Sequence, residues 1–72
     1  MKVNKTQALM FILELLIKNK QISKSDIQDQ ISISDVTFRR YIQEVRAYLN
    51  NFDMPYSLIY SKLDDIYYLK NN

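Results

Sequence analysis

The chain has 72 residues, with ten Lys and Arg against eight Asp and Glu, so it has room for one small domain with a net charge of +2. It contains no Cys, His or Gly, which excludes a disulfide framework, a zinc finger, a Cys or His nucleophile, an imidazole base and glycine-rich phosphate-binding loops. The longest apolar stretch, residues 8–17, is about half the roughly 20 residues that a membrane span requires, so we expect no membrane-spanning segment and no secretion signal.

The first predicted element is a helix over about residues 6–19. Thr6 suits the N-cap position of this helix. Its predicted buried stripe has the i, i+3, i+4, i+7 spacing of an amphipathic helix and comprises Leu9, Ile12, Leu13 and Leu16. The sequence Lys18-Asn19-Lys20 favours the end of the helix, because cations suit the negative end of the helix dipole and Asn tolerates a left-handed cap. A short extended segment, residues 21–22, follows.

Two further helices are predicted from their N-caps. Ser23, with Asp26 three residues later, has the spacing of a capping box and predicts a short helix over about residues 24–30. Ser34 is a second good N-cap, with Asp35 in the first turn, and predicts a longer helix over about residues 35–52 that Pro55 prevents from continuing. The predicted buried stripe of this third helix comprises Phe38, Ile42, Val45 and Leu49.

The C-terminal part of the chain predicts a β-hairpin. Residues 56–60 and 66–69 are rich in aromatic and β-branched residues, and the polar residues 61–65 separate them. Three helices followed by a hairpin predict a mostly α, α+β fold. We expect a single winged helix-turn-helix domain over residues 1–72, with three helices and a small antiparallel β-hairpin wing over about residues 56–70.

The face of the third helix opposite its buried stripe is predicted to carry Val36, Arg40, Gln43 and Ala47, because successive helical residues are 100° apart. Thr37 and Arg39 fall on the two flanks of that face. Arg can pair with guanine or phosphate, Thr with phosphate or a base edge, and Val can touch a thymine methyl, so the set suits a DNA groove. The alternative interpretation is that Arg39 and Arg40 are ordinary solvated residues of a helix surface.

Residues 27–45 resemble the DNA-binding domain of bacterial DeoR-type and WYL-domain transcription regulators. The positions that carry the resemblance are Ile31, Ser32-Ile33, Ser34, Thr37, Phe38, Arg39-Arg40, Tyr41 and Ile42. Ser32 stands where the family usually has a turn Gly, and Tyr41 where it prefers Asp. The resemblance extends to the preceding helix and to the strand at residues 67–69. It implies a winged helix whose third helix enters the major groove, with Ser34, Thr37, Arg39 and Arg40 touching DNA.

We therefore expect sequence-specific binding of double-stranded DNA by a bacterial, cytoplasmic transcription regulator or its N-terminal domain. No enzymatic activity, cofactor or metal is expected. The wing carries Lys62 beside Asp64 and Asp65, which phosphates would repel, so the sequence leaves wing contact with DNA open. The expected DNA-binding residues are Ser23, Lys24, Ser34, Val36, Thr37, Arg39, Arg40, Gln43 and Lys62.

Surplus apolar surface supports an alternative function. The first helix has Ala8, Met10, Phe11, Leu15 and Ile17 outside its predicted stripe. If Leu58, Tyr67 and Leu69 face inward in the hairpin, alternation leaves Ile59 and Tyr68 facing outward. The surplus either reflects the small interior of a short chain or forms a contact surface for a second copy or for a C-terminal effector domain. The alternative function is a winged-helix protein–protein interaction module that uses Phe11, Leu15, Ile59 or Tyr68.

Overall fold

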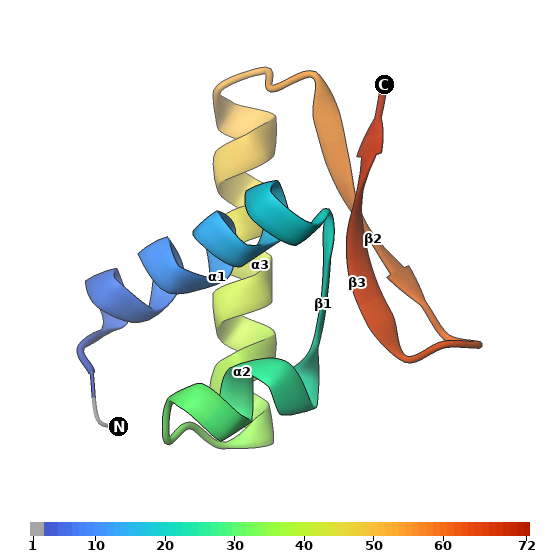
Figure 1. The fold of residues 1–72 in the computed structure, drawn as a ribbon. Helices are drawn as coiled ribbons and strands as arrows, with labels where there is room; N and C mark the ends of the chain where they lie inside the picture. The colour runs from blue at the N-terminus through green and yellow to red at the C-terminus, as the bar shows by residue number, and fades with distance from the viewer. Residues whose placement is uncertain (1–2) are drawn as a thin grey trace.

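The structure is a computed structural model that describes residues 3–72. Its elements are α1 (Lys5–Asn19), β1 (Gln21–Ser23), α2 (Lys24–Gln30), α3 (Asp35–Asn51), β2 (Tyr56–Ser61) and β3 (Ile66–Asn71). α1 crosses α3, α2 lies beside the N-terminal end of α3, and the β2–β3 hairpin lies on the other side of the molecule (Figure 1). This arrangement confirms the predicted winged helix-turn-helix fold of mostly α content.

The start of α1 differs from the prediction. Asn4, and not Thr6, is the N-cap, and its side-chain oxygen accepts a hydrogen bond from the Gln7 backbone N–H at 2.8 Å. Asn is at least as good an N-cap as Thr. The helix therefore begins at Lys5, one residue before the predicted start. At the other end Lys20 adopts the left-handed conformation, with φ 68°, and its carbonyl accepts a hydrogen bond from the Leu69 N–H at 3.0 Å. Attachment to β3 therefore helps to fix the end of α1.

The buried face of α1 is rotated from the predicted stripe. Its fully buried residues are Ala8, Ile12 and Leu16, whereas Leu9 and Leu13 are half-buried. Ala8, expected outside the stripe, is only 1% exposed, so that part of the prediction was wrong. α1 packs against α3 and against the sheet, and these neighbours decide which side of a broadly apolar helix is central.

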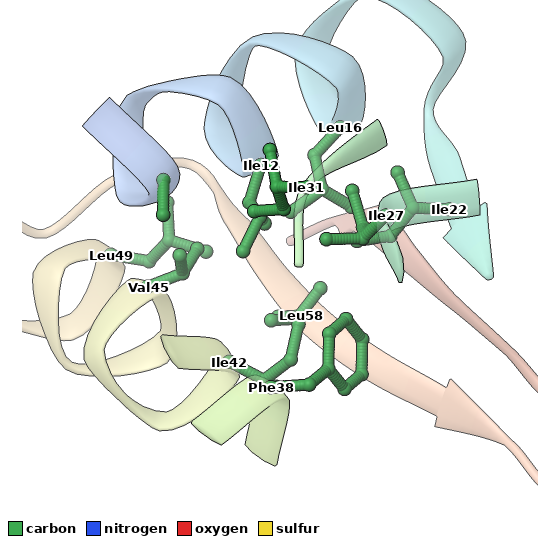
Figure 2. Close-up of a cluster of buried hydrophobic side chains, with 11 residues drawn as sticks. Ile12, Leu16, Ile22, Ile27, Ile31, Phe38, Ile42, Val45, Leu49 and Leu58 are labelled. Carbon is green, nitrogen blue, oxygen red and sulfur yellow. The ribbon is translucent and has the colours of Figure 1, made fainter. Parts of the chain in front are cut away.

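The core is a single cluster to which all three helices contribute, together with β1 and β2 (Figure 2). The predicted stripe of α3 is confirmed, and Phe38 is completely buried. Burying such side chains stabilises the fold by roughly 1.5–3 kcal/mol each relative to exposure. The buried residues are Ala8, Ile12, Leu16, Ile22, Ile27, Ile31, Phe38, Ile42, Val45, Leu49 and Leu58.

The sheet has three antiparallel strands in the order β1-β3-β2. Leu58 pairs with Leu69, and Tyr67 pairs with Tyr60 on one side and Ile22 on the other. Paired residues share a face, and on this face Leu58 and Ile22 are buried while Tyr67 and Leu69 pack against the core. Tyr60 lies on the same face but is 43% exposed. Ile59 pairs with Tyr68 on the opposite face, where both are half-buried. The pairing of β1 with β3 makes β3 the central strand.

Three residues have positive φ values in the described part of the chain, namely Lys20, Asp53 and Asp65. Ser32 is not one of them, so the turn between α2 and α3 forms without a left-handed residue at this position. The absence of Gly from this turn therefore imposes no backbone strain there.

Candidate nucleic-acid interface

The first turn of α3 is held by Ser34, as predicted. The Ser34 hydroxyl oxygen accepts a hydrogen bond from the Thr37 backbone N–H at 3.1 Å and donates to the Thr37 hydroxyl at 3.1 Å. The predicted capping box at α2 is also present: the Ser23 hydroxyl accepts from the Asp26 N–H, and the Asp26 carboxylate accepts from the Ser23 N–H. Both helices of the helix-turn-helix therefore have fixed starting points.

A polar network connects α2 to α3 across the turn. The Asp35 carboxylate accepts hydrogen bonds from Gln28 Nε2 at 2.8 Å and from Lys24 Nζ at 3.2 Å. Gln28 Nε2 also donates to the Ile33 carbonyl at 3.3 Å. The pKa of Asp35 lies below its usual 3.8. The hydrogen bond from Gln28 has the largest effect, and the hydrogen bond and positive charge of Lys24 add to it. The network holds α3 in a fixed orientation relative to α2.

This network changes the expected role of Lys24. The sequence predicts Lys24 as a DNA-binding residue, but in the free protein its ammonium group pairs with Asp35. Gln28 was not among the predicted site residues. No local pattern could have identified it, because its partner Asp35 lies seven residues away, beyond the turn.

The outer face of α3 brings most of the predicted DNA-contacting residues together. A surface hollow of about 630 Å³ is lined by Val36, Thr37, Arg39, Arg40 and Gln43, together with Lys5, Tyr41 and Glu44. Val36 is 61% exposed, and Arg39, Arg40 and Gln43 are exposed as well. Among residues 3–72, no carboxylate lies within 4 Å of a guanidinium nitrogen of Arg39 or Arg40, so both charges are open to an external anion.

The hairpin lies beside the flank of α3 that carries Arg39 and Arg46, and aromatic contacts hold it there. The Tyr67 ring meets the buried Phe38 ring edge-on at a centroid distance of 5.5 Å and lies 4.8 Å from the Tyr60 ring. The Tyr60 hydroxyl donates to Asp65 in the hairpin turn at 2.8 Å, which raises the pKa of Tyr60 above 10.0. A narrower groove of about 230 Å³ remains between α3 and the hairpin.

The tip of the wing stands apart from these surfaces. Lys62 lies in the hairpin turn and lines neither hollow, and its neighbour Leu63 is 94% exposed. Ser23 and Lys24 also lie outside the hollow on the outer face of α3. The nine predicted residues therefore do not form one continuous surface.

Residues 2–63 match the family described as the Mga helix-turn-helix domain. The chain belongs to this family. The matched range covers α1 through β2 and ends within the hairpin turn, and it includes all nine predicted DNA-binding residues. The Mga helix-turn-helix domain is a DNA-binding domain, of a class that is typically non-enzymatic. The match does not confirm the finer resemblance to DeoR-type and WYL-domain regulators. No curated protein and no solved structure matches the chain.

The apolar surface of this Mga helix-turn-helix domain is smaller than its sequence suggested. Phe11 and Leu15, which were expected on a partner surface, are half-buried and pack against the core. The exposed apolar side chains of α1 are Met10 and Ile17. The family match gives no support to the alternative function as a protein–protein module. Within residues 3–72, no helix is long and apolar enough to cross a membrane.

Proposed function

We propose that this Mga helix-turn-helix domain binds double-stranded DNA sequence-specifically, as a transcription regulator or as its DNA-binding part, with α3 in the major groove. One observation carries the proposal. Directly after a fixed N-cap, the outer face of α3 presents Val36, Thr37 and Gln43 together with two arginines that have no carboxylate of residues 3–72 within 4 Å of their guanidinium nitrogens. Such a helix face matches the size and chemistry of the major groove.

The chemistry of the side chains suggests a division of roles. Arg40, on the outer face, suits a bidentate contact with guanine, Gln43 suits adenine, and Val36 suits a thymine methyl group. Arg39, on the flank, suits a phosphate, as does the start of α3 at Ser34, where the helix dipole favours an anion. Thr37 lies between these groups and can serve either. Lys24 lies beside the start of α3 but is paired with Asp35, so it would contact a phosphate only by leaving that carboxylate.

The wider setting is also a proposal. The residues that resemble DeoR-type and WYL-domain regulators support a bacterial regulator acting in the cytoplasm, where its DNA partner would be found. A regulator also needs an input, which a second copy of the chain or a C-terminal effector domain would supply. Ser23 and Lys62 stay outside the proposed contact set, because neither belongs to α3 or is hydrogen-bonded to it.

The proposal is tested by fluorescence anisotropy with a mixed-sequence duplex over a range of salt concentrations. The wild type is compared with the double variant Arg39→Ala/Arg40→Ala. Each lost phosphate contact should reduce the magnitude of the slope of log K against log salt by about 0.9. After selection of a preferred duplex from a random pool, Arg40→Ala should cost roughly 1–3 kcal/mol on that duplex and much less on mixed sequence.

A matched control removes two positive charges elsewhere. Lys18→Ala/Lys70→Ala changes exposed residues near the C-terminal ends of α1 and β3, which lie away from α2 and from the start of α3 (Figure 1). We expect this variant to bind nearly as the wild type does. Absence of binding at low salt, or an equal loss in the two double variants, would refute the proposed function.

A further inference from the structure

The groove between α3 and the hairpin has a cationic wall. Arg39, Gln43 and Arg46 follow one another at i, i+4 and i+7, so they lie along one flank of α3. Tyr60 and Tyr67 of the hairpin form the facing wall, and the groove encloses about 230 Å³. The sequence analysis assigned no role to Arg46 or Tyr60, because the groove exists only where the hairpin folds back beside the helix.

The charges of this flank favour an external anion. No carboxylate of residues 3–72 lies within 4 Å of a guanidinium nitrogen of Arg39 or Arg46. Arg46 is half-buried, and its Nη2 donates to the Leu58 carbonyl at 3.4 Å, so its guanidinium is already held beside the hairpin. A group held in its binding position loses less entropy when the ligand arrives. Two carboxylates are near this flank, and each already has a partner. Asp35, four residues before Arg39, is paired with Lys24, and Asp65 in the hairpin turn accepts a hydrogen bond from the Tyr60 hydroxyl.

The opposite flank of α3 lacks this excess of positive charge. Lys5 of α1 lies 3.8 Å from Glu44, so the cation there is already paired with an anion on α3. Such an exposed pair contributes little to stability, but it leaves no net charge to attract a phosphate. The hairpin side is therefore the flank of α3 that attracts an anion more strongly.

The groove is continuous with the proposed DNA-reading face, because Arg39 and Gln43 line both hollows. An α-helix with its side chains is about 10–12 Å wide and fills a major groove about 12 Å wide, so the phosphates run along its flanks. We infer that the groove between α3 and the hairpin binds a phosphodiester of the DNA backbone, with Arg46 and Arg39 as its ligands. The inference rests on the proposed DNA binding and adds a contact with the DNA backbone in the groove beside the wing. Two arginines of α3 make this contact, and Lys62 at the wing tip does not.

The test compares Arg46→Gln with wild type in the same salt titration on a mixed-sequence duplex. Arg46→Gln removes the charge and should reduce the magnitude of the slope by about 0.9. Arg46→Lys keeps a positive charge and should retain most of the slope. Lys62→Gln, which removes one charge at the wing tip, should leave the slope unchanged. Circular dichroism melting establishes that each variant is folded at the assay temperature.

A second measurement needs no variant. In ¹H–¹⁵N spectra of the wild-type arginine side chains, the Arg46 Nε–H resonance should shift when the duplex is added. Inorganic phosphate at the same total phosphate concentration should leave it in place, because an isolated ion lacks the neighbouring contacts of the duplex. An unperturbed Arg46 resonance in the DNA complex, an equal shift with inorganic phosphate, or an unchanged slope in folded Arg46→Gln would each overturn the inference.

The two proposals fail in different ways. If Arg39→Ala/Arg40→Ala loses binding while Arg46→Gln retains the full slope, DNA binding stands and the groove assignment is wrong. If the wild type does not bind DNA at low salt, both proposals are wrong.

Discussion

Ser34→Ala tests how much the N-cap of α3 stabilises the domain. The substitution removes the oxygen that accepts the Thr37 N–H at 3.1 Å, and loss of one such N-cap typically costs about 1 kcal/mol. In a domain of 60–100 residues, 1 kcal/mol lowers Tm by about 4–8 °C. Circular dichroism at 222 nm during heating measures this fall. DNA affinity should fall too, because the Thr37 hydroxyl loses the hydrogen bond that orients it.

Two comparisons make this prediction specific. Ser32→Ala removes an equivalent hydroxyl from an exposed position in the preceding turn and should change the stability by no more than about 0.5 kcal/mol. Ser34→Asn restores a good N-cap and should recover most of the lost stability. Equal melting temperatures for Ser34→Ala and Ser32→Ala would show that the cap does not stabilise α3 and would refute the reasoning.

Three further outcomes are expected. Asp35→Asn should destabilise the domain at neutral pH. The folded-state pKa of Asp35 lies below 3.8, so the difference in stability between variant and wild type should shrink as pH falls through that lower pKa, as thermal melting between pH 7 and pH 2 would show. Phe38→Ala should cost about 3–5 kcal/mol, a large part of the about 4–11 kcal/mol expected for a domain of this size, measured by urea unfolding. Leu63→Ser, at the exposed wing tip, should change the stability measured by urea unfolding by less than about 0.5 kcal/mol.

Local sequence signals were sufficient for α2 and α3. Ser23 and Ser34 are caps whose partners lie three residues away, and the α3 stripe depends only on helical periodicity. The start of α1 was missed because Asn4 and Thr6 are both acceptable N-caps, and the preference of Asn over Thr at this position is small. The pairing of β1 with β3 was missed for a different reason. A three-residue strand carries almost no pattern, and its partners Ile66 to Tyr68 lie more than 40 residues away.

The same distinction applies to the proposed interface. The exposed face of α3 follows from 100° per residue once the buried stripe is known, so Val36, Arg40 and Gln43 could be placed from the sequence. Arg46 could not be assigned in this way. Its contact with Leu58 and the groove that it lines depend on where the hairpin packs, which is a tertiary property.

β3 has a larger part in the site than its position in the chain suggests. It lies beyond residues 2–63, which match the family, yet it is the central strand of the sheet. Its Tyr67 contacts Phe38 of α3 and Tyr60 of β2, so it determines how closely the hairpin approaches the helix. One residue outside the match, Tyr67, thus lines the proposed phosphate groove, whereas its other lining residues and the polar network between α2 and α3 lie within the match.

The polar network at Asp35 and the hydrogen bond between Tyr60 and Asp65 also bear on whether pH or ionic strength has the larger effect on DNA binding. The chain has no His, the side chain whose ordinary pKa lies between pH 5 and pH 8. The pKa of Asp35 is lowered by Gln28 and Lys24 and that of Tyr60 is raised by Asp65, so both groups titrate farther from neutrality than usual. Asp35 therefore stays ionised and Tyr60 stays protonated through the neutral range. Ionic strength, which acts directly on contacts between arginine and phosphate, is left as the condition to which DNA binding should respond most strongly.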